Sequence, residues 1–273
     1  MRKPLYALLV VPGVALLVVF LFYPLVAILS PTFYDTNGLS ISRYLAFFGD
    51  PYYMKILART LRIAAIATLV CAVLGLPTAY FISRQRRGVK SFLMALSIFP
   101  LLTNSVVRAF AWIILLGRNG VLNDTLLKLG WIDRPLPLLY TEFSILIGTI
   151  YLFLPLMIIT LIGSMDNIEE DITEAAESLG ASRVAAFVKI VLPLSLPGIL
   201  VGSVLVFTGT ITAYTTPNLL GGNKNMLLAT LIYQRAMSLS DWTGAGIIAL
   251  VMILMTLVVV LVMQRLAGAL DRR

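Results

Sequence analysis

Residues 166–193 read DNIEEDITEAAESLGASRVAAFVKIVLP, and this polar segment separates two long apolar stretches. Six of the thirteen acidic residues of the chain lie between Asp166 and Glu177, although the whole chain carries a net charge of +8. On either side of the segment, the sequence runs for more than twenty residues without a charge. We interpret residues 166–191 as a water-exposed segment between two membrane-crossing helices.

The composition outside this segment is that of a membrane protein. Of the 273 residues, 59% are apolar and 12% are charged, and the mean hydropathy is +0.95. Soluble domains are about 45–50% apolar and about 25% charged. A helix needs about 20 largely apolar residues to cross the hydrocarbon core of a bilayer. The stretches that meet this requirement predict spans at residues 5–29, 63–83, 91–117, 143–165, 192–216 and 242–266.

These spans are predicted to be helices, because backbone groups in lipid must satisfy their own hydrogen bonds and none of the stretches alternates as a barrel strand would. The predicted fold is therefore an all-α integral membrane domain of six transmembrane helices over residues 1–273. Basic residues gather at both ends of the chain and in the short loop between the second and third spans, which predicts both termini in the cytoplasm. The basic residues behind this orientation include Arg2, Lys3, Arg84, Arg86, Arg87, Lys90, Arg272 and Arg273.

The sequence also excludes several chemistries. It has no histidine, which excludes His-based acid/base catalysis, catalytic triads and His-containing metal sites. Its single cysteine, Cys71, lies in an apolar run and is interpreted as a buried apolar residue. It has no GxxxxGK[ST] phosphate-binding loop, so any ATP has to be bound by a partner. We predict no catalytic residue, no metal site and no cofactor in this chain.

The acidic segment has a helical pattern. Its apolar residues recur at spacings of three or four positions: Ile168, Ile172, Ala175, Ala176 and Leu179. Gly180 is expected to end this helix in a left-handed conformation, and Ser182 to cap a second helix. Two interpretations of this helix–turn–helix remain open: a solvated surface helix, or a surface that docks a basic protein partner. Membrane-anchoring helices are usually basic on their polar face, which favours docking.

The spacing of this segment resembles that of a known family. Glu174-Ala175-Ala176, then Gly180 after three residues, then Ile190 and Leu192-Pro193, match the EAA motif of binding-protein-dependent ABC importer permeases. The resemblance extends over most of the chain and is greatest to the spermidine/putrescine permease branch. The stretches that carry this second resemblance are 103–108 (TNSVVR), 120–123 (GVLN), 129–133 (LGWID) and 219–222 (LLGG).

This resemblance implies a complex in the cytoplasmic membrane of a prokaryote. The family's importers contain two permease chains, two ATPase subunits that bind ATP and Mg²⁺, and an extracytoplasmic solute-binding protein. A second, related permease is expected beside this chain, and no nucleic-acid partner. The EAA helix is expected to couple to an ATPase subunit through Glu174, Ala175, Ala176, Gly180 and Ala181.

Polar residues within the apolar stretches are candidates for the solute pathway, because they are costly in lipid. Arg108 either reaches the outer headgroups or faces a central cavity together with Thr103 and Asn104. Near the end of the fifth span, Thr210 can bond to its own helix, whereas the spacing places Tyr214 and Asn218 on one helical face. The pathway residues predicted are Thr103, Asn104, Arg108, Thr210, Tyr214 and Asn218.

Two other classes were weighed against a permease. A secondary transporter or channel would be expected to show intramembrane acids or paired broken helices in repeated halves of the sequence, and an enzyme would need an activated nucleophile. The sequence shows neither. The solute is expected to be small and polar, such as a polyamine, an opine or an amino acid. No Asp or Glu lies within the spans, which argues against a simple polyamine site unless a partner supplies the acids.

Overall fold

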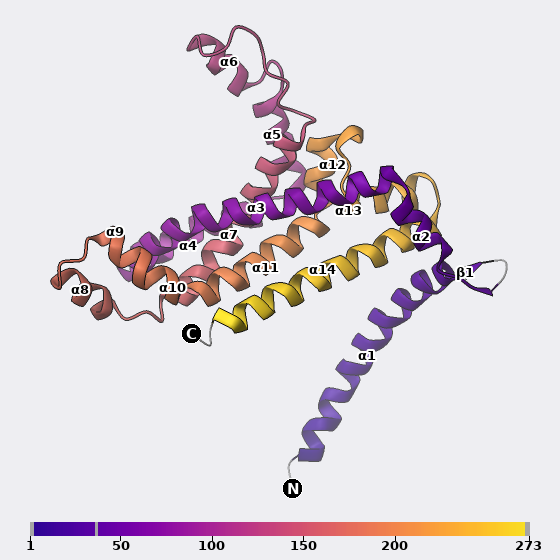
Figure 1. Ribbon diagram of the computed structural model, residues 1–273, viewed down its shortest axis with the longest axis horizontal. Helices are drawn as coiled ribbons and strands as arrows, with labels where there is room; N and C mark the ends of the chain where they lie inside the picture. Colours follow the sequence, from indigo (N-terminus) through magenta and orange to yellow (C-terminus); the bar gives the residue numbers. More distant parts are fainter. Residues whose placement is uncertain (1–2, 36–37, 271–273) are drawn as a thin grey trace. The chain divides into compact units, whose positions relative to one another are not determined.

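The computed structural model describes residues 3–35 and 38–270 (Figure 1). Arg2, Arg272 and Arg273, which entered the orientation prediction, lie outside the described residues. The first elements are α1 (Lys3–Leu29), η1 (Ser30–Phe33), β1 (Tyr34–Asp35), β2 (Gly38–Leu39), α2 (Ser42–Gly49), α3 (Pro51–Ser83), α4 (Arg87–Leu102), α5 (Ser105–Leu116), α6 (Val121–Lys128) and α7 (Glu142–Met165). The remaining ones are α8 (Glu170–Ser178), α9 (Arg183–Ala186), the π-helix η2 (Phe187–Val191), α10 (Leu192–Leu194), α11 (Leu196–Thr212), α12 (Thr215–Gly221), η3 (Asn223–Asn225), α13 (Leu228–Tyr233), the π-helix η4 (Gln234–Ser238) and α14 (Trp242–Leu270).

The helices confirm a multi-span membrane architecture. Five stretches of the described residues are long and apolar enough to cross a membrane: 11–33, 51–83, 105–128, 142–165 and 242–265. A sixth results if the segments 183–194 and 196–212, bent by 66° at Ser195, count as one span. The predicted first, fourth and sixth spans agree closely with α1, α7 and α14. Within residues 3–35 and 38–270, the small hairpin of β1 and β2, with Tyr34 opposite Leu39, is the exception to the helical fold.

The helix that contains the predicted second span is longer than that span. Helix α3 begins at Pro51, twelve residues before residue 63, and it continues through Arg59 and Arg62. The charge-free criterion began the predicted span just after these arginines. The helix can include them because Glu142 forms ion pairs with both side chains.

The predicted third and fifth spans are both broken in the structure. Residues 91–117 divide into α4 and α5, since Thr103 and Asn104 both have extended ψ angles. Residues 192–216 divide at Ser195 and again at Ala213, after which α12 begins. An apolar pattern reports which residues prefer lipid or a protein core, and it does not report where a helix changes direction.

The chain forms two compact units. The first contains residues 3–55 and 231–254. Within it, α14 packs closely on the end of α1, because a Cβ at Gly246 would lie 2.9 Å from the Ile28 carbonyl oxygen. The Phe47 and Tyr53 rings stack with centroids 4.8 Å apart, and Arg235 hydrogen-bonds to the Tyr53 hydroxyl.

The second unit contains residues 56–230 and 255–270, and α7 is its central helix. Helices α4, α11 and α12 pack against α7. Small residues permit close approach: a Cβ at Gly75 of α3 or Gly202 of α11 would lie within 2.8 Å of the Met157 side chain. Met157 and Leu161 are fully buried. This use of glycine at helix contacts is typical of membrane bundles, in which packing replaces the hydrophobic driving force.

Candidate functional site

The segment between α7 and α11 forms the predicted helix–turn–helix. Helix α8 ends at Ser178, and Gly180 has a φ angle of +91°. The Gly180 N–H donates to the Glu177 carbonyl oxygen at 2.9 Å, and the Ala181 N–H donates to that of Ala176 at 3.0 Å. These two bonds form a Schellman motif, which satisfies carbonyls at the end of a helix. The predicted left-handed residue at Gly180 is confirmed.

The second helix of this segment begins where predicted. The Ser182 hydroxyl accepts a hydrogen bond from the Ala185 N–H at 3.2 Å and so caps α9. Helix α8 packs against α9 and η2. The Phe187 ring of η2 meets the Tyr80 ring of α3 edge-on, with centroids 5.1 Å apart. The helix–turn–helix is therefore a compact unit whose second half rests on a long helix of the bundle.

The residues predicted to couple to an ATPase lie on this helix–turn–helix. Glu174 and Ala175 are exposed, Ala176 and Ala181 are half-buried, and Gly180 lies exposed at the turn. Leu179, next to Gly180, is 90% exposed, and Val184 is also exposed. In the part of the chain that the structure describes, this surface combines carboxylates with apolar side chains that the chain leaves uncovered.

The predicted apolar stripe of the first helix is divided. Ile168 is buried in the core of the second unit, whereas Ile172 and Leu179 are exposed. Thr173 is buried instead, since the chain turns that face of α8 inward. Helical spacing identified the helix but not the face that packs against its own chain.

An ion pair joins the start of the acidic segment to the first turn of α4. The Lys90 ammonium lies 2.6 Å from the Asp166 carboxylate, and both side chains are partly exposed. Exposed pairs contribute little stability. This one shows that the basic stretch 84–90, which includes the first turn of α4, and the start of the acidic segment lie on the same side of the bundle.

Three of the predicted pathway residues, Thr103, Asn104 and Arg108, lie at or just after the break between α4 and α5. The Arg108 side chain is only 8% exposed, and its Nη1 donates to the Pro100 carbonyl oxygen at 2.7 Å. The same nitrogen lies 3.3 Å from both the carbonyl and the hydroxyl oxygen of Thr103. The Asn104 side chain caps α5 by accepting from the Val106 N–H at 2.8 Å. The structure brings Thr103 and Arg108 into contact.

The other three predicted pathway residues, Thr210, Tyr214 and Asn218, lie around the break between α11 and α12. Thr210 is fully buried, and its hydroxyl donates to the Val206 carbonyl oxygen at 2.7 Å. Tyr214 is half-buried at the N-terminus of α12, and Asn218 is exposed one turn later, where its N–H donates to the Tyr214 carbonyl oxygen. Helix α5 packs against α12, so the helices that follow the two breaks are neighbours (Figure 1). That the six residues line a solute pathway stays a prediction.

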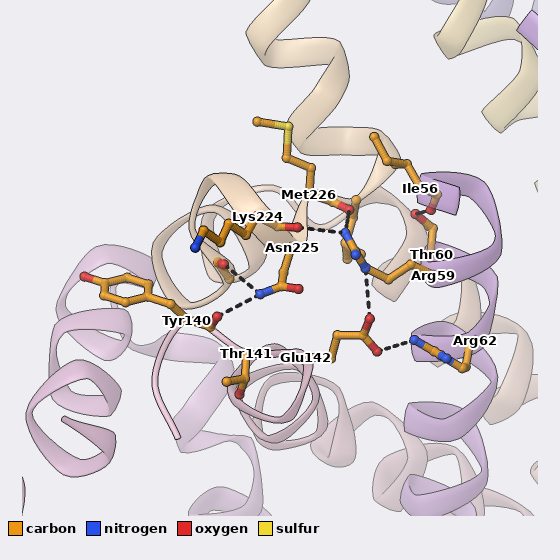
Figure 2. Close-up of polar contacts among 12 residues, drawn as sticks. Ile56, Arg59, Thr60, Arg62, Tyr140, Thr141, Glu142, Lys224, Asn225 and Met226 are labelled. Atoms are coloured by element: carbon orange, nitrogen blue, oxygen red, sulfur yellow. Dashed lines mark hydrogen bonds and ion pairs between the residues drawn. The ribbon is translucent and has the colours of Figure 1, made fainter. Parts of the chain in front are cut away.

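A charged cluster that the sequence patterns did not predict lies at the start of α7 (Figure 2). Arg59 Nε lies 2.9 Å from one Glu142 carboxylate oxygen, and Arg62 pairs with the other. Arg59 Nη1 also donates to the carbonyl oxygens of Lys224 and Met226, at 3.2 and 3.3 Å. The Arg59 side chain is 10% exposed. The sequence does contain a signal for this cluster. Two arginines three positions apart, just before an apolar run, favour a nearby carboxylate as a counter-charge.

The same region is held by backbone contacts. The Asn225 side chain donates to the Tyr140 carbonyl oxygen at 2.7 Å (Figure 2). The Tyr140 N–H and the Ser144 hydroxyl both donate to the Leu220 carbonyl oxygen, at 3.0 and 2.8 Å. The start of α7 is thereby tied to the chain that follows α12. Among residues 3–35 and 38–270, no three His, Cys, Asp or Glu side chains lie together as a metal site would require.

Comparison with known proteins agrees with this architecture. Residues 5–273 match the family described as "Binding-protein-dependent transport system inner membrane component". The spermidine/putrescine transport system permease protein PotB of Escherichia coli is 32% identical over 270 residues, which cover 97% of this chain and 98% of PotB. The ferric transport system permease protein FbpB of Actinobacillus pleuropneumoniae is 25% identical and matches 93% of this chain, but only 37% of FbpB.

Solved structures show the same fold. The bacterial ABC transporter for import of the acidic polysaccharide alginate superposes with a TM-score of 0.80 at 18% identity, covering 98% of this chain and 96% of that chain. The MetNI methionine ABC transporter gives a TM-score of 0.60 at 15% identity, covering 81% of this chain and 99% of that chain. The family match covers nearly the whole chain, and a relative above 30% identity is matched almost end to end. This chain therefore belongs to the family of binding-protein-dependent transport system inner membrane components, the permease subunits of ABC importers.

Proposed function

We propose that this permease forms half of the solute pathway of an ATP-driven importer and is coupled to an ATPase subunit through residues 166–191. The observation that carries this proposal is the compact helix–turn–helix whose exposed surface combines Glu174 and Leu179. Exposed carboxylates beside exposed apolar side chains are suited to a partner with a basic, partly apolar cleft. A solvated loop would have no need of this combination.

The proposed topology has six spans with both termini in the cytoplasm. It counts the bent pair 183–194 and 196–212 as one span. Its third span is proposed to consist of α4 and α5 together, over residues 91–117, in place of the apolar stretch 105–128. Helix α4 has 16 residues, or about 24 Å, and cannot cross a core of about 30 Å alone. The Lys90–Asp166 pair supports this topology, because it joins the two segments assigned to the cytoplasmic side.

Coupling is proposed to occur by rigid-body movement of the helix–turn–helix. Glu174 offers a carboxylate to a basic group of the ATPase, while Ala175 and the exposed turn at Gly180 allow close approach. Movement would reach the bundle through the Phe187–Tyr80 ring contact. The proposed partners are two ATPase subunits that bind ATP and Mg²⁺, a second permease, and an extracytoplasmic solute-binding protein.

The solute pathway is proposed to run past the two broken spans. Asn104 and Asn218 are exposed on the chain, and Tyr214 is half-buried beside the second break. Side chains of this kind are expensive in lipid, so they are better placed facing a cavity shared with a second permease. Thr210 is excluded from direct contact in this conformation, because its hydroxyl is buried and bonded within α11.

A polyamine is the first solute class to test, because the matched relatives are named as spermidine and putrescine permeases. This chain offers little to a polycation by itself: Glu142 at the start of α7 is already paired with two arginines. We therefore propose that carboxylates for a polyamine come from the second permease and the solute-binding protein.

The test is uptake by the complete importer in proteoliposomes, with ATP inside and radiolabelled spermidine or putrescine outside. Glu174→Arg is expected to reduce uptake at least tenfold while the protein remains inserted. Asp133→Arg makes the same charge change at an exposed position outside residues 166–191, and normal uptake is expected for it. Full uptake by the Glu174 variant would refute the coupling role, and uptake driven by an ion gradient without ATP would refute the ATP-driven class.

A further inference from the structure

The break between α4 and α5 exchanges backbone hydrogen bonds for side-chain hydrogen bonds. In a continuous helix, the Pro100 carbonyl oxygen would accept from the Asn104 N–H, and that of Thr103 from the Val107 N–H. At the break, Arg108 donates to both carbonyl oxygens, and the Val107 N–H donates to the Asn104 side chain at 3.3 Å. The break therefore has its own set of partners and is not a locally frayed helix.

Arg108 is the residue on which this arrangement depends. Its side chain is buried on a span that runs through apolar surroundings, and removing its partners would leave a buried charge unsatisfied. The hydroxyl of Thr103 donates to the same Pro100 carbonyl oxygen at 2.8 Å. The guanidinium thus donates its hydrogen bonds to oxygens of this chain, at the point where the helix changes direction.

The break decides which neighbours the two halves of the span have. Helix α4 packs against α7, whereas α5 packs mainly against α12 and α6 and also contacts α7, where the Trp112 ring meets the Tyr151 ring (Figure 1). Helix α12 follows the second break and carries Asn218. A continuous helix over residues 91–117, which the apolar pattern alone would permit, would carry α5 along the direction of α4 and away from these contacts.

We propose that Arg108 is a positioning residue: it holds the third span in its broken form, and thereby places α5 against α12. It acts through the Pro100 and Thr103 oxygens and not by touching the solute. The part of this inference that concerns transport rests on the proposed function. The part that concerns the shape of the span does not, and it can be measured separately.

The shape is measured by the distance between spin labels at Phe92 and Ile114, two exposed positions on α4 and α5. The buried Cys71 is replaced by alanine, and the assembled importer is studied in lipid nanodiscs. A continuous helix places the two backbone sites about 33 Å apart, at about 1.5 Å per residue. The wild type is expected to give a shorter distance, because α5 leaves the direction of α4 (Figure 1).

In Arg108→Leu, the population with the long distance is expected to rise about tenfold or more relative to the population with the short distance. This is the change expected for the loss of a charge-assisted hydrogen bond. Arg108→Lys keeps a cation that can donate to the same oxygens, and it should restore most of the short distance. Arg118→Gln changes an exposed arginine just beyond α5, and it should leave the distances unchanged. The same distances in Arg108→Leu as in the wild type would overturn the proposal.

The transport assay adds a second readout. If Arg108 positions α5, uptake should fall in Arg108→Leu and recover in Arg108→Lys, with the solute concentration for half-maximal uptake unchanged. A change confined to that concentration would show direct solute contact and overturn the positioning role. If Glu174→Arg transports normally while Arg108→Leu lengthens the distance, the proposed coupling function fails and the role in span shape stands.

Discussion

Replacement of Gly180 by alanine tests the physical basis of the helix–turn–helix. Gly180 has a φ angle of +91°, and a Cβ built on it would meet no atom within 4 Å. The cost of the substitution is therefore conformational and not steric. A left-handed conformation costs a non-glycine residue about 1–2 kcal/mol, which lowers the population of the formed turn about 5- to 30-fold.

Hydrogen–deuterium exchange measures this change directly. The amides of Gly180 and Ala181 donate to the Glu177 and Ala176 carbonyl oxygens, so their exchange should become about 5- to 30-fold faster in Gly180→Ala. Gly180→Asn should have a smaller effect, because asparagine tolerates the left-handed region.

The matched control is Gly163→Ala. It adds the same methyl group at a helical position of α7 where a Cβ also meets nothing within 4 Å, and exchange in α8 should not change. The reasoning is refuted if Gly180→Ala exchanges at the wild-type rate, or if the asparagine and alanine variants are equally impaired. Uptake is expected to follow the same order as the exchange protection.

Three further predictions concern stability. Glu142→Gln should lower the free energy of unfolding by about 1–2 kcal/mol, because it leaves the largely buried Arg59 without its counter-charge. Arg62→Gln, at an exposed side chain, should lower it by under about 0.5 kcal/mol. Equal losses in thermal unfolding of the two variants would contradict this. Gly148→Ala would place a Cβ 2.5 Å from a side-chain carbon of α12 and should cost about 1–3 kcal/mol, so an unchanged melting temperature would refute that packing. Ser182→Ala should speed amide exchange at the start of α9 by the loss of a cap of about 1 kcal/mol, while Ser182→Asp should not.

Local rules were sufficient for several parts of the fold. The ends of α7 agree closely with its apolar run, because its 24 residues are about the length that crosses the hydrocarbon core and acidic residues lie at both ends, Glu142 and Asp166. The turn at Gly180 and the cap at Ser182 were also predicted correctly. Both depend on interactions within a few residues, which a sequence pattern can contain.

Long-range contacts account for the errors. The charge-free criterion did not predict that α3 extends back to Pro51, because Arg59 and Arg62 pair with Glu142 some eighty positions away. The breaks in the third and fifth spans were missed because an unbroken helix has the same apolar pattern as a broken one. Their directions follow from packing, of α5 and α12 on each other and of α11 on α7.

The sequence by itself indicated a membrane permease with an acidic helix–turn–helix between the apolar stretches 142–165 and 196–212. Composition, charge position and a short motif are local quantities, and they report solvent preference and turn chemistry. Only the tertiary structure decided that Arg108 bonds to Pro100 and Thr103, that Thr210 is buried, and that Glu142 joins α3 to α7. These contacts join positions whose proximity depends on how helices bend and pack, and packing is a property of the folded chain.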